Sequence, residues 1–193
     1  MQLSPTILKA INEACRLHNG QFRKVEQDLP YVSHCVAVGW LVAEAGGSEA
    51  AITAAFLHDT LEDVPGYSYE KLVADFGKEV AAIVREVSED EENGGPRAPW
   101  KIRKEKYLKH LEIASREALL VAAADKIHNL RSMTDAYLKY GEAIWKTFHA
   151  TNNEKLWFYE QVLLILQKRL NNYLVEDLAE VLTKARNILQ EKK

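Results

Sequence analysis

The chain has 193 residues, of which 47% are hydrophobic and 27% charged, with a formal net charge of −3. Its length suits one domain that buries roughly 70% of its unfolded surface, and its composition is that of an ordinary soluble globular protein. The acidic balance argues against nucleic acid as the main partner, because nucleic-acid binders usually carry a basic face.

No apolar run approaches the roughly 20 residues that span a bilayer, so no membrane partner is expected. The first ten residues lack the basic start and the apolar core of a secretion signal. Cys15 and Cys35 form no CxxC motif, and a reducing cytoplasm is the expected location. The sequence leaves the oligomeric state open, and a homo-oligomer is one of the states it allows.

Apolar residues recur at i, i+3 and i+4 along the whole chain, whereas alternating strand patterns are scarce. Serine before proline at Ser4-Pro5 favours a helix start, and glycines favour helix ends. Residues 21–31 are polar and end near Pro30, which predicts a loop, and Pro65-Gly66 predicts a turn. Residues 89–99, which are rich in glycine and proline, are the least ordered stretch and a candidate flap. The expected helices cover 5–18, 33–45, 48–58, 68–76, 78–88, 100–113, 115–137, 152–173 and 175–190.

These patterns predict an all-α protein in which residues 1–193 form a single domain. The motifs described below occupy about 14–133, and helices within 142–191 are expected to pack on that core. The last third is rich in aromatic residues. Such residues at helical spacing more often belong to a core than to a base-stacking surface; here they are Trp145, Phe148, Trp157, Phe158 and Tyr159.

His58-Asp59, followed by Glu62-Asp63, is the most informative segment for function. A histidine and a carboxylate side by side offer a metal ion two unlike ligands. Two further carboxylates one helical turn later would repel each other unless a cation or a proton-transfer reaction uses them. Plain surface carboxylates at 62 and 63 are the alternative.

Two polar residues in apolar surroundings could complete a metal site. Asp125 follows the buried-type run from Leu119 to Ala124, where an ionised carboxylate is costly unless it is paired or binds a cation. A salt bridge from another helix would explain Asp125 equally well, and His34 alone is more often structural. His128, one turn beyond Asp125, is a rival ligand. Two histidines and two carboxylates form a mixed site that suits Mn²⁺, Fe²⁺ or Zn²⁺ better than Ca²⁺.

The order of these residues resembles that of the HD phosphohydrolases. The similarity is greatest to the RelA/SpoT-type hydrolase domain and its stand-alone versions, the small alarmone hydrolases. Five blocks carry the resemblance: Gly20-Gln21-Phe22-Arg23-Lys24, Pro30-Tyr31-Val32-Ser33-His34, Ala55 to Asp63, Phe76-Gly77-Lys78-Glu79-Val80 and Ala124 to Arg131. Two positions depart from the family pattern: Cys35 follows the histidine where proline is usual, and Asp28-Leu29 replaces a usual glycine before Pro30-Tyr31.

The resemblance implies a helical HD-domain fold and a Mn²⁺-dependent hydrolase that removes the 3′-pyrophosphate of ppGpp and pppGpp. It also implies a role for each matched residue. The metal ligands would be His34, His58, Asp59 and Asp125. Glu62 and Asp63 would position and activate water or protonate the leaving group. Arg23, Lys24 and Asn129 would contact the nucleotide, with Arg131 a weaker candidate.

Two other functions stay open on the sequence. One is an HD phosphohydrolase for a different nucleotide, such as an adenosine alarmone or a nucleoside monophosphate. The other is a nucleotide sensor that binds without turnover. The presence of both Glu62 and Asp63 argues against the sensor, because binding alone does not need a water-activating pair.

Overall fold

The computed structural model describes residues 3–24, 26, 28–89, 98–147 and 150–190. These residues form helices and no β-strand; an isolated antiparallel bridge between Phe22 and Pro30 is their one β-type feature. The predicted all-α class is confirmed. The helices are α1 (Pro5–Leu17), α2 (Val32–Glu44), α3 (Glu49–Leu57), α4 (Thr60–Asp63), α5 (Tyr69–Phe76), α6 (Lys78–Val87), α7 (Trp100–Leu111), α8 (Arg116–Tyr140), the 3-10 helix η1 (Gly141–Thr147), α9 (Asn152–Arg169) and α10 (Tyr173–Gln190).

Side-chain caps explain where several helices begin. The hydroxyl of Ser4 accepts a 3.2 Å hydrogen bond from the main-chain N–H of Ile7, and Ser48, Ser68 and Ser115 cap their helices in the same way. Thr151 and the carboxylate of Glu154 form a reciprocal capping box at the start of α9. Each cap satisfies main-chain donors that the first helical turn leaves without partners.

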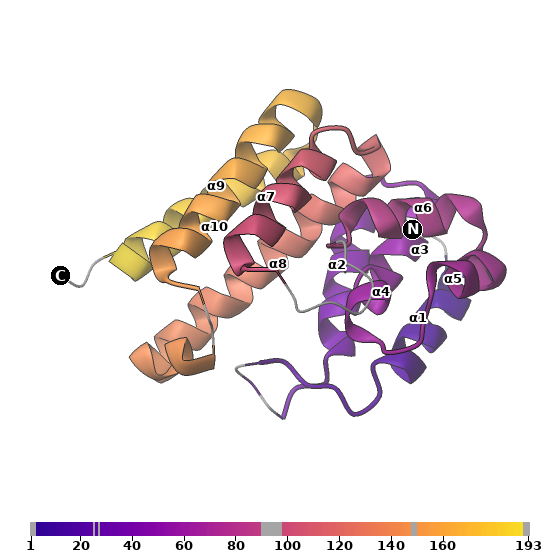
Figure 1. The fold of residues 1–193 in the computed structure, drawn as a ribbon, viewed down its shortest axis with the longest axis horizontal. Coiled ribbons are helices and arrows are strands. Elements are labelled where there is room, and N and C mark those ends of the chain that lie inside the picture. Colours follow the sequence, from indigo (N-terminus) through magenta and orange to yellow (C-terminus); the bar gives the residue numbers. More distant parts are fainter. Residues whose placement is uncertain (1–2, 25, 27, 90–97, 148–149, 191–193) are drawn as a thin grey trace.

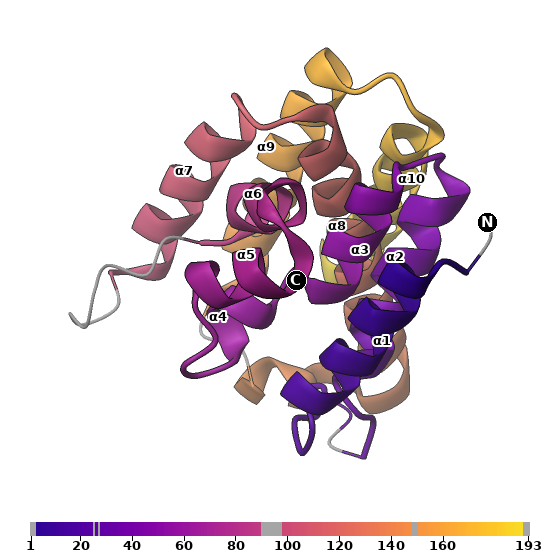
Figure 2. The ribbon, with the colours of Figure 1, turned by 90° about the vertical axis from the view of Figure 1, so that its right-hand side faces the viewer.

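Helices α3 and α8 form the centre of the molecule. Every residue from Ala51 to Leu57 in α3 is buried, and 14 of the 25 residues of α8 are buried. Helices α1, α2 and α6 pack on α3, whereas α9 and α10 lie along the other side of α8. Figure 1 shows α8 running between these two groups, and Figure 2 shows α1, α2 and α3 next to one another. One buried apolar cluster extends from α1 to α10.

Helices α2 and α3 cross with almost no space between them at Gly39. A Cβ atom at this position would lie 2.6 Å from Cζ of Phe56, so only glycine fits against that ring. The close approach sets the distance between α2, which carries His34, and α3, which ends directly before His58. Packing thus brings two polar side chains together inside an apolar region.

The structure differs from the sequence-based helix limits near the C-terminal third. The helix expected over 152–173 ends at Arg169, and the new helix starts at Tyr173. Asn172 explains the break: its Oδ1 accepts from Leu174 N at 3.1 Å, and its Nδ2 donates to Ala45 O at 2.9 Å. Asparagine favours such local bonds over a helix interior.

Two further segments changed. The helix expected over 115–137 continues to Tyr140, where Gly141 with φ +63° ends it. Thr60–Asp63, which no expected helix covers, forms one helical turn before the predicted turn at Pro65-Gly66. Most of the candidate flap lies outside the described residues. No helix in the described ranges is both long and apolar enough to cross a membrane.

Candidate metal centre

The four predicted metal ligands converge from three helices. His34 comes from α2, His58 and Asp59 follow the end of α3, and Asp125 lies within α8. The His58 Nε2 atom lies 3.1 Å from Asp59 Oδ2 and 3.7 Å from Asp125 Oδ1. The His34 Nε2 atom lies 3.2 Å from Asp125 Oδ1, 3.5 Å from Asp59 Oδ2 and 3.2 Å from His58 Nε2. These four side chains are called the donor cluster below.

The orientation of the His58 ring follows from its other nitrogen. Its Nδ1 lies 2.9 Å from the carbonyl oxygen of Ala55. A carbonyl oxygen only accepts, so Nδ1 carries a proton, and a neutral His58 presents the lone pair of Nε2 to the donor cluster. On the other side of the cluster, Nδ1 of His34 lies 2.8 Å from Nδ1 of His128.

The donor cluster favours a cation. Burial alone lowers the pKa of His58, but the carboxylates of Asp59 and Asp125 outweigh burial and hold that pKa well above its ordinary value. Burial raises the pKa of Asp59, and His58 and His34 overcome it, so that the pKa of Asp59 lies well below its usual range. Asp125 is buried and Asp59 half-buried, and two such carboxylates that stay ionised need a positive partner, which a metal ion or an imidazolium can supply.

The donor cluster fits a divalent metal ion. One ligand atom each from His34, His58 and Asp59 lies within 4.8 Å of the others, and Asp125 adds a second carboxylate. This mixed nitrogen and oxygen set suits a transition metal with room for further ligands. Bound there, a divalent ion supplies a Lewis acid that polarises a phosphoryl oxygen and makes water more acidic.

Polar neighbours hold both carboxylates of the cluster. The buried ammonium of Lys126 donates to Asp125 Oδ2 at 2.5 Å, and Asn129 Nδ2 donates to Asp125 Oδ1 at 2.5 Å. The hydroxyl of Tyr31 donates to Asp59 Oδ2 at 2.6 Å. Such outer contacts fix the direction of a ligand oxygen and preserve its charge. No role was predicted for Lys126 or Tyr31 from the sequence, although Tyr31 lies three residues before His34 in the same motif block.

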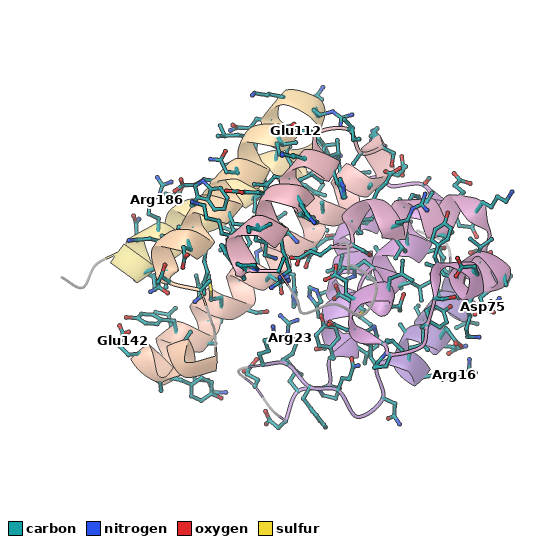
Figure 3. All side chains as sticks on the ribbon, in the orientation of Figure 1. Arg16, Arg23, Asp75, Glu112, Glu142 and Arg186 are labelled. Atoms are coloured by element: carbon teal, nitrogen blue, oxygen red, sulfur yellow. The ribbon has the colours of Figure 1, made fainter. Side chains whose placement is uncertain are left out.

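Arg23 reaches the edge of the donor cluster from the loop between α1 and α2, where Figure 3 labels it. Its guanidinium donates to Asn129 Oδ1 at 2.9 Å and lies 5.5 Å from the ring centre of Tyr31. Lys24 is exposed beside it. Asn129 therefore links Arg23 to Asp125, so two of the predicted substrate contacts lie next to the predicted metal ligands.

Glu62 and Asp63 lie one helical turn beyond Asp59, in unlike surroundings. The Glu62 side chain accepts a 2.9 Å hydrogen bond from the main-chain N–H of Glu89. Burial, and then the charge of Asp59, raise the pKa of Glu62 to about 7. Asp63 is exposed as a residue, but neighbouring groups partly exclude water from its carboxyl; this desolvation, and then the charge of Asp59, also raise its pKa.

Arg131 is the predicted site residue that the structure does not bring to the cluster. It is exposed on α8, and its guanidinium lies 2.5 Å from Asp177 Oδ1 of α10. The substrate contact predicted for it stays a prediction. The aromatic residues of α9 favour the core interpretation, since Phe158 is buried and Trp157 and Tyr159 pack against the core. The side chains of Trp145 and Phe148 lie outside the described part.

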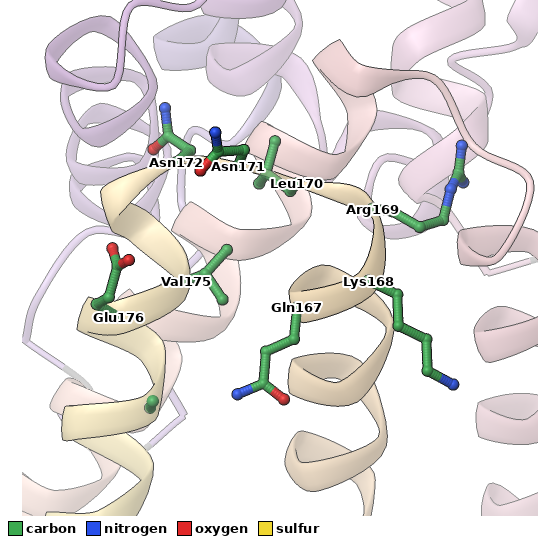
Figure 4. Close-up of a pocket in the computed structure, with 9 residues that line it drawn as sticks. Gln167, Lys168, Arg169, Leu170, Asn171, Asn172, Val175 and Glu176 are labelled. Carbon is green, nitrogen blue, oxygen red and sulfur yellow. The ribbon is translucent and has the colours of Figure 1, made fainter.

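A separate hollow of about 540 Å³ lies where α9 meets α10 (Figure 4). It contains none of the predicted site residues. Its lining is Gln167, Lys168, Arg169, Leu170, Asn171, Asn172, Val175, Glu176 and Ala179.

Comparison with known proteins decides the family. Residues 10–151 match the family profile described as HD domain. The chain belongs to the HD-domain family. This HD domain contains the whole donor cluster, and the family resemblance drawn from the motif blocks is confirmed.

Several relatives of this HD domain have a named reaction. Guanosine-3′,5′-bis(diphosphate) 3′-pyrophosphohydrolase MESH1 of Xenopus tropicalis is 36% identical over 129 residues, covering 66% of this chain and 69% of the relative. The Danio rerio protein of the same name is 33% identical over 129 residues, covering 66% and 68%.

The fold of the chain also matches a solved structure along nearly its whole length. That structure, described as a metazoan ortholog of SpoT that hydrolyzes ppGpp, superposes with a TM-score of 0.74 at 26% identity. The match covers 98% of this chain and 99% of the other.

Proposed function

We propose that this chain hydrolyses the 3′-pyrophosphate of ppGpp and pppGpp, giving GDP or GTP and pyrophosphate, with Mn²⁺ in the donor cluster. The observation that carries the proposal is the convergence of His34, His58, Asp59 and Asp125 beside a half-buried carboxyl, Glu62. The names of the MESH1 relatives and the description of the similar structure give the same reaction for those proteins.

Glu62 suits the proton transfer that this hydrolysis requires. Water attacks phosphorus, the bond from phosphorus to the ribose 3′-oxygen breaks, and that oxygen takes up a proton. A pKa of about 7 lets Glu62 exchange a proton near neutral pH, which is the condition for efficient general acid–base catalysis. In this proposal Glu62 and Asp63 position and activate the water or protonate the departing oxygen.

Arg23, Lys24 and Asn129 are the proposed contacts for the nucleotide. Guanidinium groups match phosphate oxygens through paired, charge-assisted hydrogen bonds. Arg23 is anchored by Asn129 and lies beside Tyr31, so its charge is held next to the donor cluster. Lys24 is exposed one residue further and adds a second positive charge. This geometry supports binding of a highly phosphorylated substrate.

The cytoplasm is the proposed location. Cys15 and Cys35 are both free thiols in the structure, and free thiols persist in a reducing compartment. The proposed partner is the small nucleotide, and a homo-oligomer is compatible with the proposal.

The decisive experiment is chromatography of the products after incubation of the purified protein with ppGpp and Mn²⁺. His58→Ala removes a metal ligand, and His110→Ala, on α7, is the matched control for the loss of an imidazole. GDP and pyrophosphate should form with the native protein and with His110→Ala, but not with His58→Ala.

Two other results would replace the proposal. Turnover of an adenosine alarmone or a nucleoside monophosphate without turnover of ppGpp would identify a different substrate. Tight binding of ppGpp with no product over many minutes would identify a sensor.

A further inference from the structure

The two histidines of the donor cluster differ in the hydrogen-bond partner of their Nδ1 atoms, the ring nitrogens that face away from the cluster. Nδ1 of His58 lies 2.9 Å from the carbonyl oxygen of Ala55, which can only accept a hydrogen bond. Nδ1 of His34 instead lies 2.8 Å from Nδ1 of His128, a ring nitrogen that either donates or accepts. The tautomer of His58 is therefore fixed by the main chain, whereas the tautomer of His34 depends on another side chain.

Two nitrogens 2.8 Å apart share one hydrogen, which leaves two arrangements. If His34 donates, its Nε2 presents a lone pair toward His58 Nε2 and Asp125 Oδ1, each 3.2 Å away. If His128 donates, a neutral His34 must carry its proton on Nε2, and that proton points into the donor cluster. Only the first arrangement allows His34 to bind a metal ion.

We infer that His128 is a positioning residue whose Nδ1 accepts the Nδ1 proton of His34 and thereby fixes the tautomer and ring direction in which His34 binds metal. The inference rests on the metal site of the proposed function and not on the identity of the nucleotide. It also assigns a role to the residue that the sequence offered as a rival ligand.

The position of His128 on the helix supports this role over that of a ligand. His128 lies on α8, three residues after Asp125, and its ring centre lies 4.8 Å from that of His34 with 44° between the planes. Its contact is with Nδ1 of His34, the nitrogen opposite to the one that faces the cluster. Helix α8 thus supplies Asp125 as a ligand and, one turn later, His128, which orients the ligand His34.

Metal affinity gives a test that needs no nucleotide. Mn²⁺ is titrated against a fluorescent chelator in the presence of the native protein and three variants. His128→Leu removes the acceptor, whereas His128→Asn keeps one, because the amide oxygen of asparagine occupies nearly the same place as Nδ1 of histidine. His110→Leu, on α7, controls for the loss of an imidazole elsewhere.

We expect His128→Leu to weaken Mn²⁺ binding by about 10- to 100-fold, the usual effect of removing an outer-shell partner. His128→Asn should stay within a few-fold of the native affinity, and His110→Leu should not change it. Native affinity in His128→Leu would overturn the inference. Equal losses in the leucine and asparagine variants would also overturn it, because a general packing role predicts both.

A second measurement on the native protein applies even if His128→Leu does not fold. Long-range ¹H–¹⁵N spectra of the Zn²⁺-loaded protein report which nitrogen of each histidine carries a proton. The inference requires a protonated Nδ1 and a metal-bound Nε2 in His34, and an unprotonated, metal-free Nδ1 in His128. A metal-bound nitrogen in His128 would make it a ligand instead. A failure to hydrolyse ppGpp would leave either result unchanged.

Discussion

Glu89 holds Glu62 through its main chain: the N–H of Glu89 donates a 2.9 Å hydrogen bond to Oε1 of Glu62. The Glu89 carboxylate is itself paired with Arg103 and Lys104 at the start of α7. Two cations of α7 thus fix the residue whose backbone orients the proposed acid–base group. Glu62 is held by a neutral donor, and no described residue forms an ion pair with it that would favour the ionised form.

Replacement of Glu62 by glutamine should separate catalysis from binding. Glu62→Gln keeps the size of the side chain and an oxygen for the Glu89 N–H, but it cannot take up the proton. We expect kcat on ppGpp to fall by about 10²- to 10⁴-fold, the usual contribution of a positioned acid or base. Metal content, measured by mass spectrometry, and nucleotide affinity should stay near native values. A variant that retains native turnover would remove Glu62 from the mechanism.

The pH dependence of turnover should reflect the raised pKa of Glu62. If Glu62 accepts the proton of the attacking water, it must be ionised first. Since its pKa lies at about 7, kcat should rise with pH through this region and level off above it. A kcat that falls through the same region would identify Glu62 as the proton donor. The measurement is kcat at saturating ppGpp and Mn²⁺ between pH 5.5 and 8.5.

The same carboxyl should make the folded state less stable as pH rises. Its pKa is about 7 in the folded protein against an ordinary 4.5. Between these values the folded state binds more protons than the unfolded state, so the free energy of unfolding falls with increasing pH. The difference amounts to about 3 kcal/mol over the full window. In urea unfolding of the chelated proteins, the free energy of unfolding should fall more steeply between pH 4.5 and 7 in the native protein than in Glu62→Gln; parallel curves would contradict this.

The sequence predicted the members of the donor cluster because the family motif specifies both residue type and order. Four donors on three helices can be named from His34, His58-Asp59 and Asp125 alone, and the structure brings them together. The surrounding contacts were not predictable in the same way. Whether Lys126 forms a hydrogen bond with Asp125 depends on the side-chain conformations that the helices packed around α8 allow. No local sequence pattern encodes that packing.

The helix limits likewise separate into those that local sequence signals predict and those that depend on packing. A serine cap is a local signal in the sequence. The starts of α1, α3 and α5, which Ser4, Ser48 and Ser68 cap, were therefore predictable. The break between α9 and α10 depends on a bond from Asn172 to Ala45, 127 positions away, so a local reading extended the helix through it. Arg131 likewise meets Asp177 only through the packing of α10 on α8.

Lys126 should matter more for stability than any exposed ion pair. Its ammonium and Asp125 are both largely buried, and in the metal-free protein removal of the ammonium leaves the Asp125 carboxylate without its ion-pair partner. We expect Lys126→Met to lower the free energy of unfolding by about 3–5 kcal/mol. Lys184→Met is the control, because Lys184 pairs with Glu180 at 66% and 67% side-chain exposure; it should cost about 0–1 kcal/mol. Equal losses in urea unfolding of the two variants would contradict the buried pair.

Arg23 and Arg131 should differ in their effect on substrate binding. Arg23→Gln removes a cation next to the donor cluster, and KM for ppGpp should rise about tenfold or more, since a charge-assisted hydrogen bond contributes about 1.5–3 kcal/mol. Arg131→Gln breaks the pair with Asp177 and should leave KM within about twofold. Steady-state kinetics on both variants tests this. A large rise in KM for Arg131→Gln would support the substrate contact predicted from the sequence.

Metal removal should abolish activity, and different ions should restore it unequally. A chelator that strips the donor cluster leaves His58 to take up a proton, because Asp59 and Asp125 hold its pKa well above the ordinary value. Mn²⁺ accepts imidazole nitrogen readily, whereas Mg²⁺ prefers oxygen ligands in a strict octahedron. We therefore expect Mn²⁺ to restore turnover of ppGpp at lower concentration than Mg²⁺. Asp125→Ala should lose bound metal under the same conditions. Full activity in excess chelator, or native metal content in Asp125→Ala, would show that the cluster does not work as a metal centre.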